Sequence, residues 1–216
     1  MSAVDRYTYY NIIVILLAVH IRYIQGQTYS LSGSASYGIR GGDYGFTCQI
    51  SGGNFIPIDI IQFSRDNISI CRQLLRCTPG SSSDTRYTCG CINGNNRTLY
   101  LNITNVKSTD GGTWTCGDSF NSGTSPSVTL PVYYPPTITG LTSNATSNMV
   151  DEDSTVTFTC SVDSLPSSVI SWYRSQQGGQ LYSGSQHTIP KASCQHTDNY
   201  TCTASNNIGQ PVSKTI

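Results

Sequence analysis

Two short stretches decide the fold of this chain: DGGTWTC at residues 110–116 and HTDNYTC at residues 196–202. In each stretch an aromatic residue, Trp114 or Tyr200, stands two places before a cysteine. The stretches lie 86 residues apart in a chain of 216 residues, which has room for two domains of ordinary size. The repetition therefore predicts one structural unit used twice.

A second strand with one buried face lies upstream of each stretch. Phe46 and Cys48 fall on the same side of YGFTC, and Phe158 and Cys160 fall on the same side of VTFTC, because side chains alternate between the two faces of a strand. Each half of the chain thus has two inward cysteines on separate strands, and an all-β fold is predicted.

Trp172, in VISWYR, adds a core tryptophan to the second half. Two sheets held together by a cysteine pair, with a tryptophan packed beside it and a tyrosine corner before the second cysteine, resemble the immunoglobulin fold. The resemblance covers residues 28–216 and implies two tandem immunoglobulin-like β-sandwiches. The core disulfides that it implies are Cys48–Cys116 and Cys160–Cys202.

The two halves resemble different subtypes. The two core cysteines are 68 residues apart in the first half, as in variable-type domains, and 42 apart in the second, as in I or C2-type domains. The prolines of VYYPP favour an extended junction, and the chain stops at SKTI, so we expect the last strand to be cut short. The expected segments are a signal peptide at 1–26, a variable-type domain at 27–134 and an I/C2-type domain at 135–216.

The first half departs from the family pattern in two places. Phe63 stands where the family usually has its core tryptophan, and the corner aromatic residue is Trp114 rather than tyrosine. The resemblance further implies an ion pair between Arg86 and Asp110. The second half has His196 in the place of Asp110 and shows no such pair, so a looser corner is expected there.

The N-terminus predicts export. A short apolar run at residues 12–19, preceded by Arg6 and followed by the small residue Gly26, resembles a secretory signal, with a signal anchor as the alternative. Nine cysteines in an exported chain indicate disulfides. A membrane contact is expected only through a C-terminal segment that this sequence does not contain.

Four cysteines fall in the middle of the first domain, and a fifth has no expected partner. A zinc site is the alternative for the four, but their C-x5-C and C-x-C spacing is not a zinc-knuckle pattern. Two bridges from the first pair of cysteines to the second are expected, with the connectivity open. The leftover Cys194 is a candidate for a disulfide with a missing segment or a partner chain, and the alternative is a capped or free thiol. The four extra cysteines are Cys71, Cys77, Cys89 and Cys91.

Five Asn-x-Ser/Thr sequons predict N-glycosylation. Asn102 lies between the inward residues Leu101 and Ile103, so a glycan there would cover the outer face of its sheet and leave the opposite C–F–G face open for contact. The five candidate sites are Asn67, Asn96, Asn102, Asn144 and Asn199.

Nothing in the sequence indicates catalysis, a metal or a cofactor. No nucleophile-elbow, phosphate-loop or zinc-helix motif occurs, and 12 basic residues balance 12 acidic ones, so bulk charge does not favour nucleic acid. Phe55, Ile56 and Phe120 fall in loops of the first domain where variable-type domains concentrate recognition, and they are candidate ligand contacts.

These observations together predict a secreted or cell-surface binding protein. The cysteine-rich first domain and the ASCQHTDNYTC segment are similar to adhesion and defence receptors of invertebrates such as molluscs, which implies a protein or glycan ligand on a cell surface. The favoured function is cell adhesion or immune-type recognition through the loops or the C–F–G face of the first domain. The alternatives are a soluble factor that recognises glycans or pathogens, and the leading part of an enzyme-linked receptor.

Overall fold

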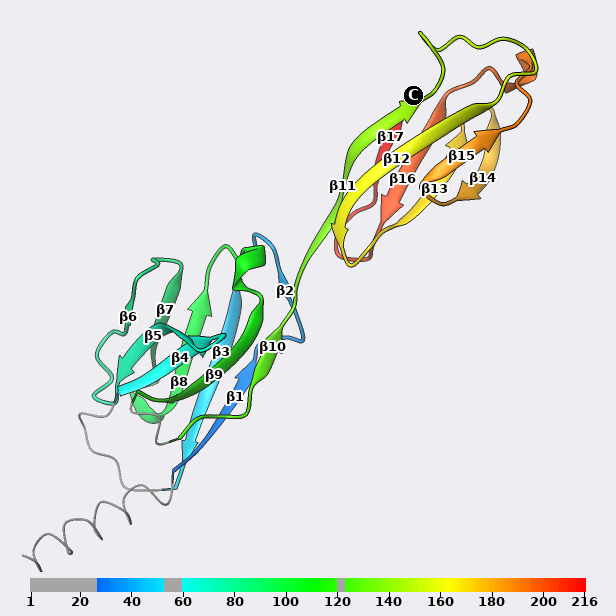
Figure 1. The fold of residues 1–216 in the computed structure, drawn as a ribbon. Helices are drawn as coiled ribbons and strands as arrows, with labels where there is room; N and C mark the ends of the chain where they lie inside the picture. Colours follow the sequence, from blue (N-terminus) through cyan, green and yellow to red (C-terminus); the bar gives the residue numbers. More distant parts are fainter. Residues whose placement is uncertain (1–26, 53–59, 120–122) are drawn as a thin grey trace, which may run out of the picture. The chain divides into compact units, whose positions relative to one another are not determined.

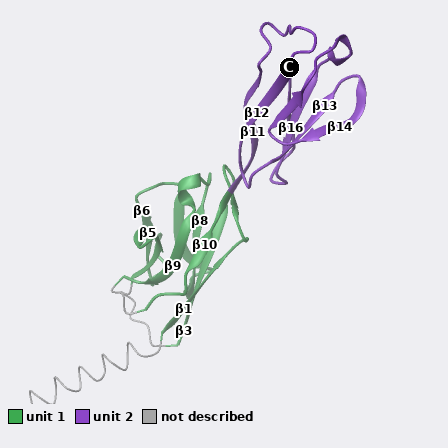
Figure 2. Cartoon of the chain, turned by 45° about the vertical axis from the view of Figure 1, so that its right-hand side comes forward, with its two compact units in different colours: residues 1–132 green, residues 133–216 purple. Residues whose placement is uncertain are grey.

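The computed structural model describes residues 27–52, 60–119 and 123–216. Its contacts divide the chain between Val132 and Tyr133 into two units (Figure 2). The described residues are almost entirely strands and turns, with two short 3-10 helices (Figure 1). Each unit is a pair of antiparallel sheets around its own core, so the predicted all-β architecture is confirmed.

The first unit contains one sheet of four strands and one of five. The four-stranded sheet has the order β1 (Thr28–Gly33), β3 (Tyr44–Ser51), β8 (Asn95–Ile103) and β7 (Tyr87–Ile92). The five-stranded sheet has the order β10 (Val128–Leu130), β9 (Gly112–Asp118), β4 (Ile60–Arg65), β5 (Ile68–Leu74) and β6 (Ser81–Ser82).

Short elements complete the first unit. The 3-10 helix η1 (Ser108–Asp110) leads into β9, and β2 (Gly38–Ile39) adjoins the start of β11 (Val132–Ser143), the strand that continues into the second unit. The Gly38 N–H donates to the Pro131 carbonyl at 2.9 Å.

The second unit has a three-strand layer, formed by β11 with two further strands, and a four-strand sheet. The layer continues from β11 to β12 (Val156–Leu165) and β15 (Gln186–Ile189). The sheet has the order β14 (Gln177–Ser183), β13 (Val169–Arg174), β16 (Tyr200–Ser205) and β17 (Val212–Thr215), and the 3-10 helix η2 (Cys194–His196) precedes β16. β17 pairs with β16 along its whole length, and Tyr200 and Ile216 exchange both backbone hydrogen bonds.

The two cores share one plan, but the tryptophan stands at a different position in each. It lies on the corner strand β9 in unit 1 and on β13 in unit 2. Phe63 lies opposite Cys116 in the register of unit 1, and Trp172 lies opposite Cys202 in unit 2. Phe63, Trp114 and Trp172 are all completely buried. In unit 1 the larger ring thus comes from the corner strand β9.

Candidate binding surface

The outer side of the five-stranded sheet is the C–F–G face that the sequence indicated. Along β4 and β5 the inward side chains are buried, and their alternating neighbours point to solvent. We define the outer face by Ile60, Gln62, Arg72, Leu74 and Thr115.

Strand pairing arranges this outer face in two rows. Gln62 lies between Arg72 on β5 and Gly117 on β9, and Ile60 lies opposite Leu74. Leu74 is 39% exposed. The outer face therefore offers an apolar pair beside an amide and one cation, which suits the mixed chemistry of a protein contact.

Two further disulfides fix the edge of this sheet. Cys71 on β5 is bonded to Cys89 on β7, and Cys77, just after β5, is bonded to Cys91 on β7. The first bridge joins the five-stranded sheet to the four-stranded one, and the second joins the turn after β5 to the four-stranded sheet. They hold β5, the strand that carries Arg72 and Leu74, in place before any partner binds, and such preorganisation lowers the entropic cost of binding.

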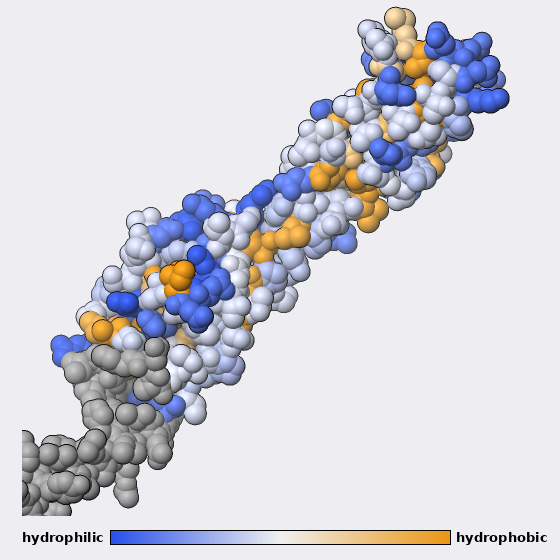
Figure 3. All heavy atoms as spheres, in the orientation of Figure 1, coloured by the Kyte–Doolittle hydropathy of each residue, from blue (hydrophilic) through white to orange (hydrophobic). Residues whose placement is uncertain are grey.

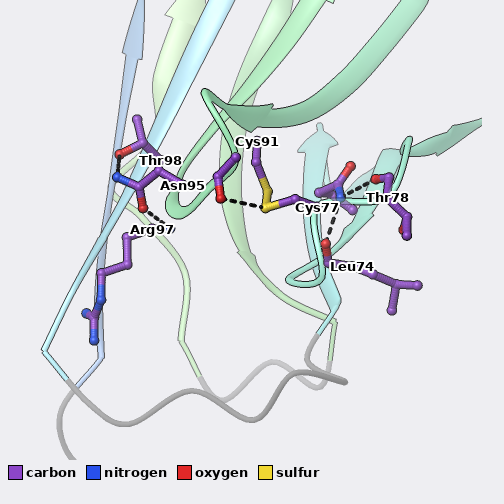
Figure 4. The surroundings of a disulfide bond; sticks show 9 residues. Leu74, Cys77, Thr78, Cys91, Asn95, Arg97 and Thr98 are labelled. Atoms are coloured by element: carbon purple, nitrogen blue, oxygen red, sulfur yellow. Dashed lines mark hydrogen bonds between the residues drawn. A yellow bond between two sulfur atoms is a disulfide. The ribbon is translucent and has the colours of Figure 1, made fainter.

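A buried glutamine is hydrogen-bonded to the turn after β5, which contains Cys77 and Thr78 (Figure 4). The Gln73 side chain is completely buried, and its Nε2 donates to the carbonyl oxygens of Leu74 at 2.6 Å and Thr78 at 2.5 Å. A side chain on Gly80 would collide with the Cys89 sulfur, because an added Cβ would lie only 2.3 Å from it. The conformation of this turn is therefore fixed by the Gln73 amide, by the lack of a side chain at Gly80 and by the two disulfides.

The opposite sheet presents Asn102 at its centre. Asn102 is exposed on β8, with the completely buried Leu101 and Ile103 on either side in sequence. In the register it lies between Gly45 on β3 and Thr88 on β7. An added Cβ at Gly45 would lie 3.3 Å from Asn102 Oδ1, so the glycine leaves room around this side chain.

The remaining sequons occupy other positions. Asn67 is an exposed turn residue between β4 and β5, and Asn96 is half-buried on β8. Asn144 is held by its own side chain, since Nδ2 donates to the Thr155 carbonyl at 3.0 Å and Oδ1 accepts from the Thr157 N–H at 2.9 Å.

The Asp110 carboxylate is the most constrained charge of unit 1. It is completely buried and accepts hydrogen bonds from Arg86 Nη1 at 2.6 Å, Arg86 Nη2 at 3.1 Å, the Lys107 N–H at 2.8 Å and the Tyr87 hydroxyl. Burial by itself raises the pKa of Asp110, but these donors outweigh it and hold the pKa below its usual range. The carboxylate is saturated with partners, so its role is structural.

The second unit contains an ion pair that the sequence analysis missed. Arg174 Nε lies 3.0 Å from Asp198 Oδ2, so the expectation that this half has no such ion pair is wrong. The pair runs from β13 to the residue two places before Tyr200, while the Arg86–Asp110 pair uses the 3-10 helix. By its position in the sequence, His196 was compared with Asp110, whereas the acidic residue of the pair is Asp198. An acidic residue near the corner was a visible signal in the sequence.

The cysteines of the core also lie together. Cys48 is bonded to Cys116 and Cys160 to Cys202, each bridge joining the two sheets of its unit. Cys194 is the first residue of η2 and carries an exposed, unpaired thiol.

Some predicted features lie outside the described residues. These are the signal peptide at 1–26 and the candidate contacts Phe55, Ile56 and Phe120. In the part of the chain that the structure describes, no helix is long and apolar enough to span a membrane. The described surface in the view of Figure 3 is mostly hydrophilic or neutral, with small apolar patches.

Comparisons with known proteins agree with this architecture. The immunoglobulin domain family matches residues 135–206. Mouse hemicentin-2 is 32% identical over 122 residues, which are 53% of this chain, and the chain spans 2% of the length of that protein.

Several solved structures align with most of this chain. The first two immunoglobulin domains of DIP-gamma align with a TM-score of 0.65 and 17% identity, over 86% of this chain and 95% of that one. An amphioxus IgVJ-C2 molecule aligns with a TM-score of 0.57 and 21% identity, over 82% and 96%. The N-terminal eight domains of Down Syndrome Cell Adhesion Molecule align with a TM-score of 0.60 and 19% identity, over 88% and 24%.

The two disulfide-linked sandwiches, each with an aromatic corner, define an immunoglobulin-type protein. Residues 135–206 match the immunoglobulin domain family, and both units have the immunoglobulin-like fold.

Proposed function

We propose that this chain is an extracellular binding module for cell adhesion or immune-type recognition, and that it works without catalysis. The module comprises a variable-type domain at 27–134 and an I/C2-type domain at 135–216. Its expected partner is a protein or glycan on a cell surface, bound by the outer face of the first domain together with the neighbouring loops. Four disulfides support an oxidising compartment such as the cell exterior.

One observation carries the proposal: the solvent-facing sides of the two sheets of unit 1 differ in their candidate glycosylation sites. Two candidate glycosylation sites, Asn96 and Asn102, lie on β8 of the four-stranded sheet. The outer face has none on its strands and exposes Leu74 and Arg72 instead. A glycan at Asn102 would block protein contacts on its own sheet, and the outer face would stay accessible.

The printed descriptions of similar structures favour a protein partner. DIP-gamma was crystallised bound by the first immunoglobulin domain of Dpr11, and another similar chain is a cell adhesion molecule. Their low identity supports the fold rather than a shared ligand, so the ligand of this chain has to be found by experiment.

A binding screen with matched variants tests the proposal. The secreted chain would be tetramerised and applied to a panel of cell-surface ectodomains and to a glycan array. We expect a protein hit that is lost in Leu74→Asp and Arg72→Glu and retained in Thr88→Glu, a change on the opposite sheet. A hit that tolerates both outer-face changes but is lost in Thr88→Glu would overturn the assignment of the face.

A further inference from the structure

Unit 2 contains a cavity of about 460 Å³ at the end of the sandwich where η2 lies. This volume lies within the range of small-molecule sites. Its apolar wall combines the more exposed Ala145, Val150 and Ile216 with side chains of the core, which are at most 8% exposed. These core side chains are Val156, Phe158, Ile189, Ala192 and Tyr200.

The polar wall of this cavity is mostly neutral. It includes the amides of Asn148, Gln176 and Asn199. The one carboxylate, that of Asp198, already accepts from Arg174 Nε at 3.0 Å, the Gln176 N–H at 3.0 Å and the Asn199 N–H at 2.7 Å. No lysine or arginine lines the cavity, so its chemistry suits a neutral group with both polar and apolar parts.

His196 adds a hydrogen-bond donor to the same wall. The backbone N–H of Ser193 donates to His196 Nδ1 at 3.1 Å, so Nδ1 acts as an acceptor. The neutral ring then carries its proton on Nε2, where it can donate to a carbonyl or hydroxyl oxygen.

The sequence supplies a group of this kind at the rim. Asn199, which lines the cavity and is exposed, begins the sequon Asn199-Tyr200-Thr201. Its side-chain amide makes no hydrogen bond to the described residues, whereas both amide atoms of Asn144 are engaged. Among these two sequons of unit 2, only Asn199 combines an available amide with a cavity next to it.

We propose that the cavity is the seat of the first N-acetylglucosamine of a glycan on Asn199. In the attachment, Nδ2 exchanges one proton for a bond to C1 of the sugar, and the lipid pyrophosphate that carried the oligosaccharide leaves. The acetamido group matches the neutral amide and imidazole donors, and its methyl group and the ring C–H face match the apolar wall. The covalently attached sugar covers side chains of the unit 2 core. This role does not depend on the ligand proposed for unit 1.

Trimming the glycan tests this role. The full chain would be secreted from cells that add high-mannose glycans, and occupancy of Asn199 would be measured by peptide mass spectrometry. An endoglycosidase then leaves one N-acetylglucosamine on each asparagine. We expect hydrogen exchange in β12 to be the same with the intact and the trimmed glycan, and several-fold faster in Asn199→Gln and Thr201→Ala, which have no glycan at this site.

Matched variants separate the sugar from the side chains. Thr201→Ser keeps the sequon and should exchange like the parent, whereas Thr201→Ala also loses the hydroxyl contact with Thr215. Asn67→Gln removes a sequon of unit 1 and should leave β12 unchanged. An unoccupied Asn199, or equal exchange in β12 with and without the first sugar, would overturn the proposal.

Discussion

The indole N–H of Trp114 donates a hydrogen bond at 3.0 Å to the carbonyl oxygen of Asp110, four residues earlier in the chain. The Tyr200 hydroxyl donates in the same way at 2.9 Å to the carbonyl of His196, also four residues earlier. In both units the acceptor is the last residue of a 3-10 helix, η1 or η2. The corner of the immunoglobulin fold is thus made twice with different aromatic residues, and a carbonyl that lacks a strand partner is satisfied in each.

Replacing Tyr200 by Phe tests the corner of unit 2. The ring would still pack against Phe158, whose centroid lies 4.5 Å away, but the His196 carbonyl would lose its partner. We expect unit 2 to lose about 1–2 kcal/mol of unfolding free energy. The chain has two tryptophans, Trp114 in unit 1 and Trp172 in unit 2, so 19F NMR of fluorotryptophan-labelled protein in urea reports each unit separately. An unchanged Trp172 midpoint would contradict a stabilising corner bond.

Asp110→Asn should weaken unit 1 much more. The amide can still accept from Lys107, but Arg86 would be left without its main counter-charge in a nearly buried position, with 15% of its side chain exposed. We expect a loss of about 3 kcal/mol, as for other broken buried pairs. Asp84→Asn is the matched control, because Asp84 also bonds Arg86 at 2.9 Å but is 40% exposed, and its loss should be much smaller. Urea unfolding followed at Trp114 distinguishes the two.

The sequence predicted the fold because the deciding residues are short-range patterns. Alternation around Cys48 and Cys160 shows which side of a strand is buried, and the aromatic residue two places before the next cysteine indicates the corner. The class of fold follows from these patterns without any knowledge of long-range contacts.

The candidate surface was less accessible from sequence. That Leu74 lies opposite Ile60, and that Cys71 bonds Cys89 rather than Cys91, depends on strand register, and a bulge between Phe63 and Ser64 shifts that register. The pairing of Arg174 with Asp198 depends on the approach of β13 to the corner. No local pattern encodes such distances, so these features became visible only in three dimensions.

Acid should destabilise unit 2 through His187. Its imidazole lies half-buried among the rings of Phe158, Trp172 and Tyr200, with centroids 6.0–6.3 Å away, and burial lowers its pKa from the model-peptide value of 6.5. The unfolded chain therefore takes up a proton more readily than the folded one. The contribution of neutral His187 to the free energy of unfolding is fully present above about pH 6.5. It decreases as the pH falls from there towards the lowered pKa of the folded state.

His187→Phe is the matched variant for this pH effect. It keeps a ring in the cluster and removes the imidazole of His187, so the unfolding midpoint of unit 2 should vary less with pH between 5 and 7 than in the parent. Unit 1 is the internal control, because no histidine occurs among its described residues. A parent protein whose Trp172 midpoint is already flat over this range would show that protonation of His187 is not costly.

The two extra disulfides of unit 1 should differ in their resistance to thiols. Cys71 and Cys89 are 1% and 4% exposed, whereas Cys77 and Cys91 are both only partly buried, so a thiolate reaches the second bridge more easily. We expect mild dithiothreitol treatment of the folded chain, followed by differential alkylation and mass spectrometry, to open Cys77–Cys91 first. Replacing both of these cysteines by serine removes a cross-link over 14 residues, which should cost unit 1 about 3 kcal/mol on the chain-entropy model. Simultaneous alkylation of all four cysteines would instead mean that reduction follows unfolding of the whole unit. The Cys77–Cys91 bridge at the edge of the outer face would then not be separately reducible.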